Sequence, residues 1–168
     1  MKVFIIAAVT TDGFIGRDEN QLSLDWTSNA DKVLFMQLTK RAGVVVMGSR
    51  TFATMQRTLP ERRLIVYTSQ PEKITLEGVE KTSEDPHELI ERLKNEGAKG
   101  VAISGGAAIY DMFMKADLVD EMYLTIEPVL FGSGVRLFRD STLDHRLTLL
   151  ESRHRADGSI VLHYRINK

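Results

Sequence analysis

Apolar residues gather in short runs along this chain, and each run ends in a polar or glycine-bearing turn. The first run, residues 3–9, is continuous and rich in β-branched residues, which is typical of a central strand covered on both faces. Similar runs predict strands at residues 44–47, 64–67, around Val79 and 101–103. The segments between them predict helices that begin near Asp31, near Thr51, at Pro86 and after Gly106.

The last third of the chain follows a different pattern. A long strand is predicted over residues 121–130, followed by a glycine-rich loop at Phe131–Gly134. Strands over 147–155 and 159–166 flank Asp157-Gly158, which is a strong two-residue hairpin signal. We therefore expect an α/β fold with a mixed, mainly parallel central sheet, about four flanking helices and an antiparallel C-terminal hairpin.

Composition adds limits to this picture. The 168 residues are 43% hydrophobic and 27% charged, which fits one domain over residues 1–168. The net charge is -1 and the basic residues are dispersed, so we expect no nucleic-acid partner. Cysteine is absent and the four histidines lack metal-ligand spacing, so we expect a cytoplasmic protein without a metal site. No segment has the length that a membrane span needs.

The helix near Asp31 carries a carboxylate in line with its apolar stripe. Asp31, Leu34, Phe35 and Leu38 fall at i, i+3, i+4 and i+7, so all four share one helix face. A charge on the face that normally meets the core needs a partner or a chemical role, because an unpaired buried charge is costly. Ser28 stands three residues before Asp31, so a capping box at the helix start is the other interpretation.

Hydroxyl and glycine residues follow several of the predicted strands. Residues 48–51, GSRT, lie between a strand and a helix, where free amides and a cation favour an anion. Thr68 and Ser69 end the next strand, and Gly105-Gly106 precede a later helix. Ligands of open α/β sheets bind at such strand ends, although ordinary turns use the same residues. The polar segment 17–24 is predicted to be a loop that covers this region.

Taken in order, these segments resemble dihydrofolate reductase. The resemblance rests on IIAAVTTDGFIG, DWTSNADKVLF, VVMGSRTF, LPERRLIVYTSQP, ISGGAAIY and MYLTIEP, which together span most of the chain. Each piece is a weak signal alone, but their order and spacing together are specific. The resemblance implies NADPH-dependent reduction of 7,8-dihydrofolate, with hydride transfer to C6 and protonation of N5.

The resemblance also implies residue roles. The catalytic set is Asp31, which hydrogen-bonds the pterin ring, with Trp26 and Thr125. The implied substrate residues are Ile6, Ala7, Phe35, Met55, Leu59, Ser104 and Arg62, the last of which grips the glutamate tail. The implied NADPH residues are Ala8, Ile15, Gly16, Gly48, Ser49, Arg50, Thr51, Thr68, Ser69, Gly105, Gly106, Ala107, Ala108, Ile109 and Tyr110. The expected partner is dihydrofolate, and the chain would act as a monomer or a homodimer.

Some positions depart from the family pattern. Lys32 and Ser104 stand where apolar residues are usual, and the loop before Trp26 is longer than the bacterial norm. The segment FGSGVRLF resembles the reductase domain of riboflavin biosynthesis, which shares the fold and the cofactor but reduces a ribosylamino-pyrimidine phosphate. That reductase is the alternative prediction. A homologue that binds a pterin or nucleotide without turnover is the third.

Overall fold

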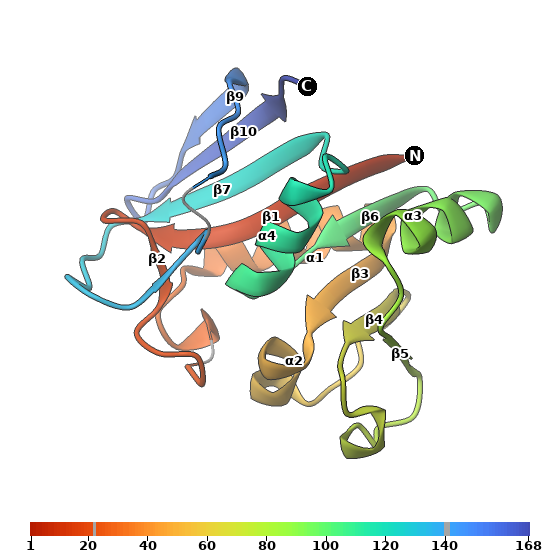
Figure 1. The fold of residues 1–168 in the computed structure, drawn as a ribbon. Helices are drawn as coiled ribbons and strands as arrows, with labels where there is room; N and C mark the ends of the chain where they lie inside the picture. The colour runs from red at the N-terminus through yellow and green to blue at the C-terminus, as the bar shows by residue number, and fades with distance from the viewer. Residues whose placement is uncertain (22, 140–141) are drawn as a thin grey trace.

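A single eight-stranded sheet runs through the computed structural model, which describes residues 1–21, 23–139 and 142–168 (Figure 1). Across the sheet the strands are β5 (Val79–Thr82), β4 (Arg63–Tyr67), β3 (Gly43–Gly48), β6 (Gly100–Ile103), β1 (Lys2–Thr10), β7 (Glu121–Glu127), β10 (Ile160–Ile166) and β9 (Leu147–His154). Neighbouring strands from β5 to β7 are parallel, whereas β10 pairs antiparallel with both β7 and β9. The predicted mixed sheet with a central first strand is confirmed.

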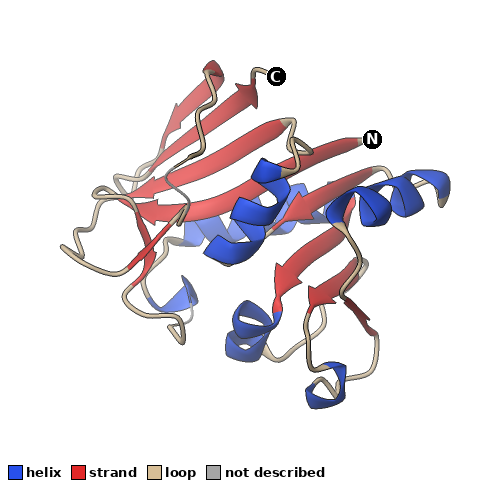
Figure 2. Cartoon of the chain, in the orientation of Figure 1, coloured by secondary structure: helices blue, strands red, loops and turns tan. Residues whose placement is uncertain are grey.

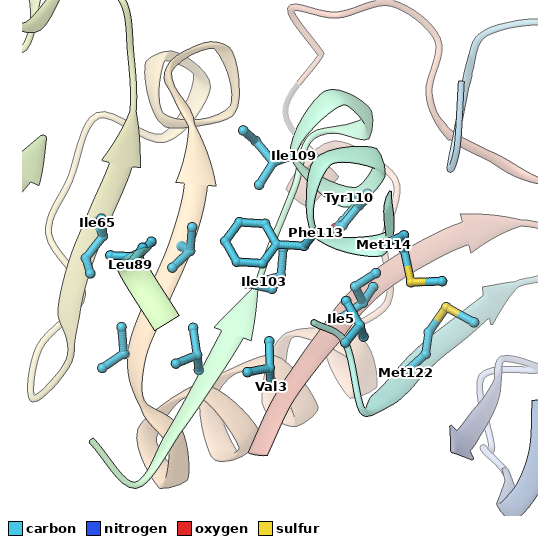
Figure 3. Packing of buried hydrophobic residues seen from close by; sticks show 14 of the residues in the cluster. Val3, Ile5, Ile65, Leu89, Ile103, Ile109, Tyr110, Phe113, Met114 and Met122 are labelled. Carbon is cyan, nitrogen blue, oxygen red and sulfur yellow. The ribbon is translucent and has the colours of Figure 1, made fainter. Parts of the chain in front are cut away.

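Four helices cover the two faces of this sheet (Figure 2). They are α1 (Asn29–Ala42), α2 (Ser49–Met55), α3 (Pro86–Asn95) and α4 (Ala107–Lys115). Helices α3 and α4 pack on one face, where Phe113 of α4 is fully buried among Ile5 and Ile103 (Figure 3). Leu34 and Leu38 of α1 pack on the opposite face. The predicted number and positions of the helices agree with the structure.

The structure corrects several predicted boundaries. Strand β7 ends at Glu127 rather than at residue 130, because Pro128 has no amide hydrogen to donate to a sheet ladder. A second small sheet, β2 (Phe14–Gly16) with β8 (Val135–Arg136), and two short 3-10 turns, η1 (Ser23–Asp25) and η2 (Pro71–Lys73), were not predicted. Such short elements carry too few residues for a periodic signal. Within the described ranges, no helix is both long and apolar enough to cross a membrane.

Candidate active site

A cavity of about 290 Å³ opens where the parallel strands reach their carboxyl ends. This edge of an open α/β sheet is where ligands usually bind. Its walls come from β1, the start of α1, the β3–α2 and β6–α4 turns, and the loop after β2. The residues of the sequence-based set that line it are Ile6, Ala7, Ala8, Ile15, Gly16, Asp31, Phe35, Gly48, Ser49, Arg50, Thr51, Ser104, Gly105, Gly106, Ala107, Ala108, Ile109 and Tyr110.

The other residues of the sequence-based set lie outside this lining. They are Trp26, Met55, Leu59, Arg62, Thr68, Ser69 and Thr125. Leu59 is buried in the core cluster formed with β3 and β4, and Met55 packs against the same cluster. Thr68 lines a neighbouring hollow with Ser49 and Arg50, whereas Ser69 is exposed.

The helix start before Asp31 explains why its carboxylate is free. Ser28 is the N-cap residue of α1, and its side chain accepts a hydrogen bond from the backbone N–H of Asp31 at 3.1 Å. In a capping box the acid would bind the Ser28 amide in return. Here that amide donates to Oε1 of Glu127 at 2.8 Å. Because Glu127 supplies this half of the cap, the Asp31 side chain can line the cavity.

The surroundings of Asp31 favour its protonated form. Burial is the largest cause, and it raises the pKa of Asp31. The neighbouring Thr125 hydroxyl lowers this pKa, the Glu127 carboxylate raises it, and the Lys32 ammonium group lowers it. The Thr125 hydroxyl lies near this carboxyl group without reaching full hydrogen-bond geometry. Glu127 itself is only 3% exposed. Sequence reasoning missed Glu127, although its i+2 spacing from Thr125 places it on the strand face that α1 covers.

We expect Glu127→Gln to lower the pKa of Asp31, because the substitution removes a like charge and retains an oxygen that can accept the Ser28 hydrogen bond. Asp31 should therefore ionise at a lower pH than in the parent protein. Because a raised pKa makes the folded state lose stability as pH rises through it, this loss of stability should be smaller in the variant. Carboxyl NMR titration of Asp31 measures the change. Glu121→Gln is the control, since Glu121 lies on the same strand but pairs with Lys2 and His163. An Asp31 titration unchanged by Glu127→Gln would contradict this assignment.

Buried polar atoms around the site that have no hydrogen-bond partner among the described residues include the Trp26 indole nitrogen and the hydroxyls of Thr125, Ser104 and Tyr67. Trp26 packs edge-on against Phe131, with ring centroids 5.1 Å apart. Unpaired buried polar groups are costly, so they are uncommon in a core without a reason. Ser104 and Tyr67 line the cavity, and their buried hydroxyl oxygens are unpaired there.

Arg62 and Arg63 point in opposite directions from the sheet edge. Arg62 is 8% exposed, and it donates to the Pro60 carbonyl and to Thr39 Oγ1, each at 2.9 Å. Its Nη2 has no partner within the described chain, so the buried guanidinium has unused donors. Arg63 instead pairs with Glu80 and Glu96 on the other side.

Two glycine-bearing turns form a narrow cradle beside the cavity. The Gly48 amide donates to the Gly105 carbonyl at 2.7 Å, which ties the start of α2 to the turn before α4. A side chain at Gly106 would meet Thr51 Oγ1 at 3.2 Å, and Gly105 has a positive φ of 104°. First-turn amides of a helix have no partner within it. The cradle therefore fits the diphosphate of a dinucleotide, which needs close backbone approach and free amides.

The cavity also contains residues that sequence reasoning did not assign. They are Asp18, Glu19, Gln21, Ser23, Thr54, Tyr67, Val135 and Arg139. The first four belong to the polar segment that was predicted to cover a site. No local pattern marks Arg139, because its place at the cavity depends on long-range contacts: β8 pairs with β2, and the Arg139 amide donates to Asp111 of α4. Among the residues that the structure describes, no group of three or more acidic or histidine side chains could hold a metal ion.

Comparison with known proteins defines the class. A family model described as dihydrofolate reductase matches residues 2–133, and the chain belongs to this family. The uncharacterized protein YwjB of Bacillus subtilis is 28% identical over 171 residues, covering 97% of each chain. A putative riboflavin biosynthesis protein from Shewanella superposes with a TM-score of 0.84 at 24% identity over the full length of both chains. Dihydrofolate reductase of Enterococcus faecalis, solved with NADP(H), gives a TM-score of 0.78 at 22% identity, covering 99% of this chain and 97% of its own.

Proposed function

We propose that this chain reduces 7,8-dihydrofolate to tetrahydrofolate with NADPH, as a cytoplasmic step of one-carbon metabolism. The observation that carries the proposal is the Asp31 carboxyl group, which lines the cavity and has a raised pKa. A carboxyl group in such a place can hydrogen-bond an amino-pterin ring and support proton delivery to its N5. Family membership supports the same reaction.

The chain's own residues would orient the reactants. NADPH, when bound, supplies a hydride, and the glycine cradle with Ser49 and Thr51 would hold its phosphates. Phe35 lies on the same helix face as Asp31 and would pack against the pterin ring. The Tyr110 hydroxyl donates to the Ile6 carbonyl at 2.9 Å, which fixes the cavity wall on the first strand. Asp31 would then hold the ring and promote protonation at N5.

The riboflavin-type reductase stays the second candidate. Two observations favour it: Ser104, a cavity residue with an unpaired buried hydroxyl, stands where the folate reductases carry an apolar residue, and Arg62 lies outside the cavity lining. A ribosylamino-pyrimidine could use the hydroxyl, and it needs no tail-binding arginine. Steady-state oxidation of NADPH with dihydrofolate tests the first candidate. If the protein binds the cofactor but consumes neither substrate, the result would favour the third candidate, a binding protein without turnover.

We expect Arg50→Ala to erode a preference for NADPH over NADH by roughly tenfold, because a guanidinium contact to the 2′-phosphate is a charge-assisted hydrogen bond. Arg50 stands in the first turn of α2 and lines the cavity. The measurement is the ratio of kcat/KM for the two cofactors. Arg57→Ala, an exposed arginine just beyond α2, is the control. If Arg50→Ala and the parent share one ratio, Arg50 does not bind the 2′-phosphate.

A further inference from the structure

Three charged side chains from distant parts of the chain meet at the mouth of the cavity. Glu19, in the loop after β2, pairs with Arg50 of α2 and with Arg139, which follows β8. All three line the cavity. The Arg139 amide donates to both carboxylate oxygens of Asp111 at 3.1 and 3.2 Å, which fixes its backbone beside α4. The two arginines are therefore held beside helices α2 and α4, whose first turns form the glycine cradle.

This cluster has the geometry of an anion site that is occupied by the protein's own Glu19 carboxylate. Arg50 donates to one carboxylate oxygen of Glu19 and Arg139 donates to the other. A phosphate group offers the same acceptors with more charge, and guanidinium groups match it well. The side chains are 42–63% exposed, so the two ion pairs are weak and can be exchanged for a stronger ligand.

We propose that Arg50 and Arg139 together bind a phosphate group of the dinucleotide, and that Glu19 occupies this pair in the free protein and must leave when the dinucleotide binds. The inference rests on the proposed use of a nicotinamide dinucleotide, and it adds a ligand, Arg139, and a competitor, Glu19. The role proposed above for Arg50 makes this the 2′-phosphate; the diphosphate carries the same chemistry, and the ligand comparison below distinguishes the two. The ion pairs of Glu19 then hold its loop across the cavity only while the cofactor is unbound.

Glu19→Gln should tighten NADPH binding roughly three- to tenfold, because binding no longer has to break two exposed ion pairs. Isothermal titration of the intact protein measures the affinity directly, without turnover. Asp25→Asn is the control, since it removes the same charge from an exposed position between β2 and α1 that is outside the cavity lining. Equal tightening by both variants would mean a general charge effect and would overturn the proposed competition.

The Arg139→Gln variant distinguishes two roles for Arg139: binding the phosphate group, or only holding Glu19 in place as a tether. A ligand role predicts binding weakened roughly five- to tenfold, even though the substitution also releases Glu19. A tether role predicts tighter binding, as in Glu19→Gln, and would overturn the assignment of Arg139. Arg136→Gln, at an exposed position on β8, is the control.

The ligands themselves identify the phosphate. NADH lacks the 2′-phosphate but keeps the diphosphate, and adenosine lacks both. Variant effects confined to NADPH assign the 2′-phosphate, and equal effects on NADPH and NADH assign the diphosphate. Equal effects on adenosine would overturn a phosphate site. A parent protein that binds neither dinucleotide would refute the proposed function, whereas normal parent binding with unchanged variants would refute only the two-arginine site.

Discussion

Asp31→Asn should lower the rate of hydride transfer to dihydrofolate at neutral pH by roughly a hundredfold or more. The amide keeps the shape of the side chain but cannot carry the proton or the charge. The backbone N–H that Ser28 caps is unchanged, so helix α1 should form as in the parent. NADPH affinity should also persist, because the glycine cradle lies on other elements. Single-turnover rates with bound NADPH measure the step itself.

Asp25→Asn provides the control for this experiment, since Asp25 is an exposed acid in the short turn before α1. It should leave the single-turnover rate at the parent value. If Asp31→Asn also retains that rate, Asp31 has only a structural role at the helix start, and the proposed chemistry fails.

Arg62→Leu should weaken dihydrofolate binding roughly ten- to hundredfold, because one charge-assisted contact is worth about 1.5 to 3 kcal/mol. The unpaired Nη2 of Arg62 could donate a charge-assisted hydrogen bond to the α-carboxylate of a folate tail. Since Arg62 does not line the present cavity, the tail has to reach it past Met36, whose sulfur lies 3.3 Å from Nη1. A dihydropterin without the tail should show no such loss. The measurement is kcat/KM for both substrates.

Arg63→Leu is the matched control, because Arg63 is the adjacent cation but pairs with Glu80 and Glu96 away from Arg62. It should affect the two substrates equally and weakly. Equal losses for both substrates in Arg62→Leu would mean that Arg62 supports the fold or the cavity shape. That outcome would favour the riboflavin-type reductase.

The sequence predicted the sheet and helices well because their signals are local. The continuous apolar run of β1 and the proline at the start of α3 fix those elements within a residue or so. The end of β7 was placed too late because apolar residues return at Val129 and Leu130, whereas Pro128 interrupts the ladder. Arg63 is half-buried in ion pairs whose partners lie on β5 and just beyond α3, contacts that no local pattern predicts.

The residues of the candidate site also fall into two groups: those that a local pattern marks and those that only long-range contacts place. Residues of strand ends and helix starts, such as Asp31 and Gly48, could be found because motif and position coincide. Glu127 and Arg139 could not, because their parts in the site depend on contacts between segments about a hundred residues or more apart. Long-range ion pairs and shared caps leave no periodic trace in one sequence. Leu59 lies in the core cluster and Met55 packs against it, so the substrate role that the resemblance implies for these two residues stays a prediction.

Paired steady-state assays of NADPH oxidation, with dihydrofolate in one and a ribosylamino-pyrimidine phosphate in the other, would decide what this protein reduces. We expect NADPH consumption with dihydrofolate, formation of tetrahydrofolate in equal amount, and loss of that turnover in Asp31→Asn. The pyrimidine phosphate should give no oxidation above the rate without substrate. Consumption with the pyrimidine phosphate alone would contradict the proposed folate reduction and assign the cavity to the riboflavin-type reaction.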